Sequence, residues 1–143
     1  MKFYNREDEM KMIRQTEERS RSTACFTAIM GRRRVGKTTL LRKALEGKKY
    51  IYLFVSRTSE VLLCDAFKRE ITDTLSIPIY GTPTRFRDLF ELLMQHAASE
   101  HFTLIIDEFQ DFDRVNPSIF SDIQNMWDRY SPLAKINFIV CGS

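Results

Sequence analysis

A short segment near the N-terminus has the composition and spacing of a phosphate-binding loop. Residues 31–39 read Gly-Arg-Arg-Arg-Val-Gly-Lys-Thr-Thr and match the pattern G-x-x-x-x-G-K-[ST]. The glycines let backbone N–H groups curl inward around an anion, and the N-terminus of the following helix continues this nest. Lys37 is expected to reach the β- and γ-phosphates and the Thr38 hydroxyl to bind Mg²⁺. The pattern predicts binding of a nucleoside triphosphate.

The flanks of this loop supply the strand and the helix that the motif requires. Residues 26–30 are apolar or small and predict a strand, and residues 39–45 have helical spacing. The arginine run 32–34 is explained by solvated loop charge, or by one arginine that meets a phosphate or an acidic neighbour. The loop positions expected to contact the nucleotide are Gly31, Arg34, Val35, Gly36, Lys37, Thr38 and Thr39.

Two acidic residues follow a second apolar run. Residues 101–106 predict a buried parallel strand, and Asp107 and Glu108 come directly after it. Because open α/β sheets bind ligands at the carboxyl ends of their strands, both carboxylates should lie beside the phosphate loop. We expect Asp107 to hold Mg²⁺ through water and Glu108 to polarise the attacking water, so the predicted catalytic residues are Glu108 and Lys37. Alone, the pair also fits a strand end with solvated charges.

Composition is that of an ordinary globular domain. The chain has 143 residues, 43% hydrophobic and 29% charged, which predicts a single domain. Its net charge of +3 is too small to indicate nucleic acid or an anionic membrane as a partner. No apolar run approaches the ~18 residues of a membrane-spanning helix, and the polar N-terminus is unlike a signal peptide, so we expect a cytoplasmic protein. The three cysteines, Cys25, Cys64 and Cys141, lack metal-type spacing and are expected to be reduced core thiols.

Helical and strand patterns alternate along the chain, which predicts an α/β fold with a mostly parallel sheet between two helical layers. Strands are expected at 24–30, 49–55, 101–106 and 135–141, and helices near 5–21, 37–46, 59–75, 84–98 and 117–130. One strand lies between the phosphate-loop strand and the Asp-Glu strand. This insertion, with a glutamate after the metal-binding aspartate, resembles the additional-strand, catalytic-glutamate division of P-loop NTPases. The Asp-x-x-Gly and Asn-Lys signatures of GTPases are missing, so adenine nucleotide is favoured.

Four segments, in family order, resemble the archaeal-type ATPases, a group related to the AAA and STAND ATPases. Residues 3–10 resemble the opening F-x-N-R-E-x-E-L, and residues 31–40 resemble the loop G-x-R-R-V-G-K-T-x-L. Residues 105–110 are similar to I-I-D-E-F-Q, and residues 137–143 to the final core strand that ends in Gly-Ser. Met10 departs from the commoner leucine without chemical consequence.

The resemblance implies an ATP-binding and Mg²⁺-dependent hydrolysing core coupled to an unknown effector. It implies that Arg6 lies near adenine and ribose, although helix capping and surface charge explain this residue equally well. Gln110 and Ser143 match positions near the γ-phosphate and are sensor candidates; a polar strand end also explains Ser143. The alternative function is a nucleotide-dependent switch or scaffold in which hydrolysis is incidental. Glu108 favours the enzyme, because a pure binder does not need a carboxylate at the water position.

The resemblance also implies a longer protein. Family members continue into a further strand, a helical lid and a C-terminal region, so residues 1–143 are expected to be an incomplete P-loop ATPase core. By the usual strand order of the division, strand 24–30 would then be an unpaired edge. We expect this fragment alone to hydrolyse ATP very slowly or not at all. We also expect self-association, through neighbouring subunits or through the exposed edge.

Overall fold

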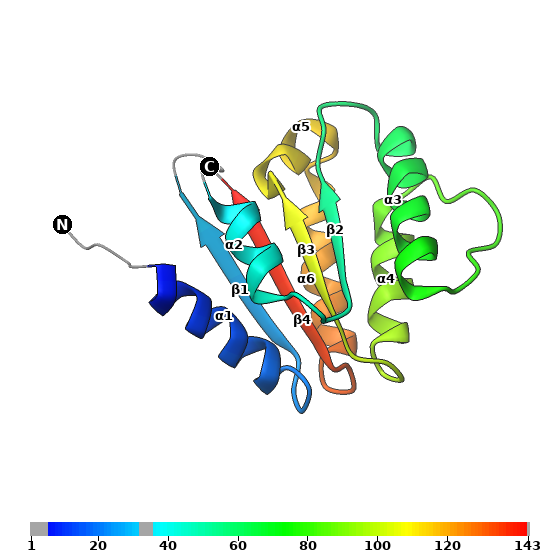
Figure 1. Ribbon diagram of the computed structural model, residues 1–143. Coiled ribbons are helices and arrows are strands. Elements are labelled where there is room, and N and C mark those ends of the chain that lie inside the picture. Colours follow the sequence, from blue (N-terminus) through cyan, green and yellow to red (C-terminus); the bar gives the residue numbers. More distant parts are fainter. Residues whose placement is uncertain (1–5, 32–35, 143) are drawn as a thin grey trace.

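One parallel sheet organises the protein (Figure 1). The computed structural model describes residues 6–31 and 36–142, with Arg6 described by its backbone alone. In these ranges four strands pair in the order β1-β4-β3-β2, and every pairing is parallel. Their bounds are Cys25–Met30 for β1, Tyr50–Phe54 for β2, Phe102–Asp107 for β3 and Ile136–Gly142 for β4. This sheet confirms the predicted α/β class and places β1 at an edge.

Burial differs between the central and the edge strands as their sequences predict. Every residue of β3 and β4 is buried, which suits the nearly continuous apolar runs of strands covered on both faces. The edge strands β1 and β2 alternate between more and less buried residues. The carboxyl ends of the two central strands, β3 and β4, therefore lie side by side in the middle of the sheet.

Helices cover both faces of the sheet (Figure 1). Helices α1 (Arg6–Arg19) and α2 (Lys37–Ala44) lie on one face, and α3 (Glu60–Leu75), α4 (Phe86–His96) and α6 (Ser118–Tyr130) lie on the other. The smaller apolar cluster joins α1 and α2 to the sheet and includes Ile13, Leu41, Ile105 and Ile139. The larger cluster, under α3, α4 and α6, includes Phe67, Phe86, Phe90 and Phe138. The result is the predicted three-layer sandwich.

Two short helices and several element ends differ from the sequence prediction. The 3-10 helix η1 (Phe109–Asp111) and helix α5 (Phe112–Val115) follow β3 and were not predicted, because a helix of one turn shows no periodicity. Helix α2 ends at Ala44 rather than at residue 46, and Gly47 follows with a left-handed φ of 79°. Helix α4 is shorter than predicted at both ends. Residue 5, at which the first helix is predicted to begin, lies outside the described residues.

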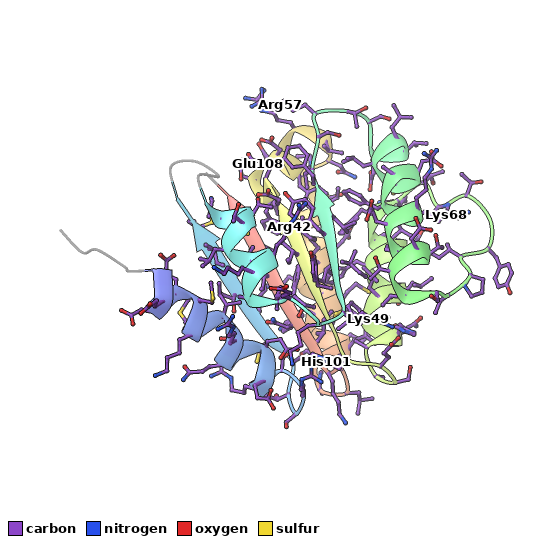
Figure 2. All side chains as sticks on the ribbon, in the orientation of Figure 1. Arg42, Lys49, Arg57, Lys68, His101 and Glu108 are labelled. Atoms are coloured by element: carbon purple, nitrogen blue, oxygen red, sulfur yellow. The ribbon has the colours of Figure 1, made fainter. Side chains whose placement is uncertain are left out.

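Polar contacts at the amino ends of the strands anchor α1. Glu17 is only 3% exposed and accepts a hydrogen bond from Arg21 at 2.8 Å. Ser20 Oγ lies 2.8 Å from His101 Nε2, and burial lowers the pKa of His101. Figure 2 shows His101 at the end of the sheet opposite Glu108. These residues therefore stabilise the fold at a distance from the predicted site.

The cysteines are free, buried thiols, as predicted. In the β1–β4 register Cys25 pairs with Asn137, whereas Cys141 pairs with Ile29, so the two cysteines lie at opposite ends of the pairing. Burial raises the pKa of Cys64 to about 12.

In the described part of the chain, none of the helices combines the length and the apolar character needed to cross a membrane.

Candidate active site

The predicted phosphate loop is tied to the tip of β4. The backbone N–H of Gly31 donates to the carbonyl oxygen of Gly142 at 3.1 Å. The same oxygen accepts a hydrogen bond from Lys37 Nζ at 2.6 Å. A Cβ at residue 31 would lie 3.8 Å from Lys37 Nζ, an ordinary van der Waals distance, so the start of the loop and the ammonium group are neighbours. Both ends of the loop thus meet the strand that ends the described chain.

The start of α2 has the features of an anion site. Gly36 adopts φ 79° and ψ −9°, a left-handed conformation that favours glycine, and its carbonyl accepts the first helical bond from Leu40 at 2.8 Å. The first turn contains no acidic residue that would repel a phosphate. Thr38 is half-buried and Thr39 is exposed in this turn. Backbone N–H groups and two hydroxyls are therefore available at one helix terminus.

Asp107 is the last residue of β3 and is held through both carboxylate oxygens. The residue is buried, with only 2% of its surface exposed. Oδ2 accepts a hydrogen bond from the hydroxyl of Tyr52, and Oδ1 accepts one from the backbone N–H of Glu108 at 2.9 Å. Because a buried carboxylate is costly without hydrogen bonds, these donors stabilise the group in its buried position.

Glu108 follows in a conformation that is unusual for a residue with a side chain. Its φ is 55°, in the left-handed region, which costs of order 1–3 kcal/mol and is retained only where the surroundings hold it. The carboxylate is half-buried at the carboxyl end of the strands (Figure 2). Oε2 accepts a hydrogen bond from Gln110 Nε2 at 2.7 Å. The turn after β3 therefore fixes both acidic residues by backbone and side-chain contacts.

Gln110 connects Glu108 to the tip of β4. A Cβ at Gly142 would lie 2.7 Å from Gln110 Oε1 and 2.8 Å from Met30 Cε. Contacts this short exclude a side chain at residue 142 unless its neighbours move. Gln110 Oε1 is buried without a hydrogen-bond partner in the described part of the chain. Close packing on Gly142 thus positions the amide that reaches Glu108.

The thiol of Cys141 is affected by the charges of three predicted site residues. Burial raises the pKa of its thiol to about 11, and the charge of Asp107 adds to this increase. The ammonium of Lys37 lowers the same pKa, whereas Glu108 raises it. One point in the fold is thus influenced by all three charged residues that the sequence predicts for phosphate chemistry.

A groove beside the phosphate loop separates α1 from the first turns of α2. Its volume is about 680 Å³. The lining residues are Glu7, Met10, Arg14, Gly36, Thr39, Leu40 and Lys43. Gly36 and Thr39 belong to the predicted loop positions. The α1 residues of this lining were not predicted individually as site residues. Met10 and Arg14 are four residues apart and therefore lie on one face of the helix.

Some predicted site residues lie outside the described residues. These are Arg34, Val35 and Ser143, together with the side chain of Arg6. Among the residues that the structure describes, no group of three or more His, Cys, Asp or Glu side chains has the arrangement of a metal site. Tyr52 was missed by sequence reasoning, because its contact with Asp107 depends on the alignment of β2 with β3.

Comparisons with solved structures reveal the same fold. Cdc6p from Pyrobaculum aerophilum aligns with a TM-score of 0.67 and 19% identity, over 99% of this chain and 39% of its own. The Walker-type ATPase PABY2304 of Pyrococcus abyssi aligns with a TM-score of 0.61 and 20% identity, over 97% of this chain and 47% of its own. These likenesses identify the fold as that of an ATPase-type P-loop module.

Sequence comparison identifies the family. The uncharacterized protein MJECL04 of Methanocaldococcus jannaschii is 26% identical over 141 residues, which cover 99% of this chain and 29% of that protein. The chain therefore spans less than a third of the length of this relative. A family model described as an ATPase domain predominantly from Archaea matches residues 3–143. Since this match takes in nearly the whole sequence, the protein belongs to this family of archaeal-type ATPase domains.

Proposed function

We propose that this protein binds ATP and hydrolyses it in a Mg²⁺-dependent reaction, as an AAA- or STAND-like module coupled to an effector. The observation that carries the proposal is the convergence of Lys37, Asp107 and Glu108 around the tip of β4. Lys37 donates to the carbonyl of Gly142 at 2.6 Å, and Gln110, which donates to Glu108 at 2.7 Å, lies against Gly142. Asp107 directly follows Ile106, which pairs with Val140 near the end of β4. A cation for phosphate, a buried carboxylate and a second carboxylate are the groups that phosphoryl transfer to water needs.

Nucleotide binding is assigned to the loop and to the adjoining groove. Lys37 would exchange the Gly142 carbonyl for the β- and γ-phosphates, while the loop amides from Gly31 to Thr39, including those of Arg34 and Val35, surround the phosphate oxygens. The groove of about 680 Å³ between α1 and α2 adjoins Gly36 and Thr39 and has room for the nucleoside. Arg6, at the start of α1, would then lie near adenine and ribose.

Thr38 and Asp107 would hold Mg²⁺. A hydroxyl and a carboxylate are oxygen ligands of the kind Mg²⁺ prefers, and Mg²⁺ commonly keeps several waters and completes its shell with substrate phosphates. A site with one protein carboxylate therefore fits this ion. When bound, Mg²⁺ neutralises charge on the β- and γ-phosphates. Asp107 would contribute by accepting a hydrogen bond from water at the ion.

Glu108 is proposed as the general base and Gln110 and Ser143 as γ-phosphate sensors. A water in line with the γ-phosphate would donate to the carboxylate of Glu108, which would take its proton as the new P–O bond forms. The bond between the γ-phosphorus and the bridging oxygen would break in the same step, with ADP as the leaving group. In the structure the amide of Gln110 donates to this carboxylate at 2.7 Å. That contact also favours the second candidate function, a nucleotide-dependent switch, because the amide of Gln110 and the attacking water would compete for this carboxylate.

The setting of this module is part of the proposal. We place it in the cytoplasm and assign residues 1–143 to a single P-loop ATPase core. Self-association is proposed through neighbouring subunits or through the edge strand β1, where Phe26 is 53% and Met30 62% exposed. Nucleic acid is not proposed as a partner, since the net charge is only +3.

Binding is tested with Lys37→Ala. Loss of the only charged phosphate ligand on the first turn of α2 should remove most ATP affinity, measured by calorimetry on the 143-residue chain, while the unfolding temperature stays close to that of the wild type. Lys135→Ala is the matched control, because this exposed lysine precedes β4 at its opposite end. Equal ATP affinity in a folded Lys37→Ala protein would refute the site.

Hydrolysis is tested with Glu108→Gln in the natural protein that contains residues 1–143. The amide keeps the size of the side chain but cannot take a proton, so phosphate release should fall by ~10²-fold or more while ATP still binds. A wild-type rate in this variant would exclude Glu108 as the base and favour the switch.

A further inference from the structure

A tyrosine from the edge strand β2 contacts the carboxylate proposed to bind Mg²⁺. The hydroxyl of Tyr52 donates to Asp107 Oδ2, while the backbone N–H of Glu108 donates to Oδ1 at 2.9 Å. We infer that Tyr52 is a positioning residue that sets the orientation of the Asp107 carboxylate toward Mg²⁺ and its waters. This inference rests on the proposed function, and it assigns to Tyr52 a role in cation binding rather than in the chemical step.

The strand register explains why residue 52 can perform this task. Tyr52 pairs with Ile105, and Phe54 pairs with Asp107, so Tyr52 lies two positions behind the carboxylate along the neighbouring strand. Residues two apart on a strand share a face of the sheet. Tyr52 and Asp107 therefore both lie on the face covered by α2, and a long side chain with a hydroxyl at its tip spans the diagonal between them.

The aromatic ring of Tyr52 is itself held in place. The guanidinium carbon of Arg42 lies 5.7 Å from the ring centroid, within the range of a cation–π contact. Figure 2 shows Arg42 extending from α2 toward β2. The ring also packs against the smaller apolar cluster under α1 and α2. With its ring fixed by a helix and by a strand, the hydroxyl has a defined position.

The chemistry of the donor suits a cation site. Each carboxylate oxygen can accept more than one hydrogen bond, so a phenol on Oδ2 leaves capacity for a metal-bound water. Unlike an arginine or a lysine, the phenol brings no positive charge that would repel Mg²⁺. Partners that hold a metal ligand from behind commonly change metal affinity by 10–100-fold when they are removed. Because Asp107 is only 2% exposed, water has limited access to replace the hydroxyl.

The test compares Tyr52→Phe with Tyr50→Phe. Each variant loses one hydroxyl from the same face of β2, but Tyr50 pairs with Thr103, near the opposite end of β3 from Asp107. Calorimetry measures affinity for a non-hydrolysable ATP analogue, first in EDTA and then over a series of Mg²⁺ concentrations. We expect Tyr52→Phe to weaken binding in Mg²⁺ by about 10-fold and to leave binding in EDTA unchanged. Tyr50→Phe should match the wild type in both conditions.

The outcomes separate this inference from the function on which it rests. If wild-type affinity depends on Mg²⁺ and Tyr52→Phe gives the same Mg²⁺ series, Tyr52 has no positioning role and the proposed function stands. Equal weakening in EDTA and in Mg²⁺ would also overturn the inference, since it indicates a general structural effect. Tighter Mg²⁺-dependent binding by Tyr52→Phe would overturn the inference as well, because it would mean that the hydroxyl competes with the cation for Asp107. A wild-type protein that binds the analogue without any Mg²⁺ dependence would overturn the metal site and this inference together.

Discussion

The carboxylate of Glu60 joins three elements of the larger layer, and its removal offers a sharp test of how that layer is held. Glu60 is the first residue of α3. Its Oε2 accepts a hydrogen bond from the backbone N–H of Phe86 at 2.9 Å, and its Oε1 accepts one from Asn116 Nδ2 at 2.9 Å. The N-cap residue of α4, Arg85, makes no side-chain cap of its own. Glu60 therefore caps α4 from a neighbouring helix and also binds the residue that ends α5.

The magnitude follows from these two contacts. Loss of a helix N-cap costs about 0.5–2 kcal/mol. The hydrogen bond from Asn116 to a charged acceptor contributes about 1.5–3 kcal/mol when buried, and less here because Glu60 is half-buried and water replaces part of it. We therefore expect Glu60→Ala to lower the free energy of unfolding by about 2–3 kcal/mol. Glu60→Gln, which keeps one acceptor oxygen, should cost roughly half as much.

Urea unfolding measures this change, with Glu70→Ala as the control. Glu70 lies on the same helix and is exposed, so its removal should alter stability by less than about 0.5 kcal/mol. The slope of the unfolding free energy with urea should be the same in all variants, because the fold is unchanged. If Glu60→Ala and Glu70→Ala have the same midpoint, the two hydrogen bonds contribute nothing and the reasoning is wrong.

Three further outcomes are expected. Gly142→Ala should change the free energy of unfolding in urea by less than about 1 kcal/mol, because the atoms that its Cβ would approach, Gln110 Oε1 at 2.7 Å and Met30 Cε at 2.8 Å, are the ends of flexible side chains that can move aside; a loss above about 2 kcal/mol would show that both ends are held rigidly. Folding raises the pKa of the Cys64 thiol from 9.0 to about 12, so its contribution to stability is complete below pH 9 and is lost as the pH rises toward 12. Between pH 9 and 11 the wild type should therefore lose stability faster than Cys64→Ala, by up to about 1.4 kcal/mol per pH unit, and parallel curves would contradict the pKa shift. In the same protein at pH 8, iodoacetamide should label neither Cys64 nor Cys141 until urea is added.

Sequence reasoning could predict a candidate site because each motif lies within one segment. The loop glycines and Lys37 follow a strand directly, and Asp107 and Glu108 come directly after an apolar run. In a parallel sheet all strands end at the same edge, so two local patterns were enough to predict a shared site. The roles of the individual residues remain predictions, whereas the sheet that gathers them is confirmed.

Contacts across the sheet could not be predicted from a single sequence. The bond from Tyr52 to Asp107 requires that β2 be the neighbour of β3 in a particular register, and the packing of Gln110 on Gly142 requires the position of η1. Nothing in the residues around Glu60 identifies the N-terminus of α4 as its partner. Such contacts depend on tertiary alignment, in which a shift of one residue reverses the face of every side chain.

Two buried carboxylates at opposite ends of the sheet are held by different kinds of donor. Glu17 is 3% exposed and pairs with the guanidinium of Arg21 at 2.8 Å, so its charge is compensated within the chain. Asp107 is equally buried, yet the donors that the structure gives it, the Tyr52 hydroxyl and the Glu108 amide, are both neutral. Neutral donors satisfy the oxygens and fix their direction but leave the negative charge in place. Because a buried charge of this kind is costly unless it is paired, the site gains most from a cation that arrives from solution. If the proposed function holds, the same two hydrogen bonds that allow Asp107 to be buried would also orient it toward Mg²⁺.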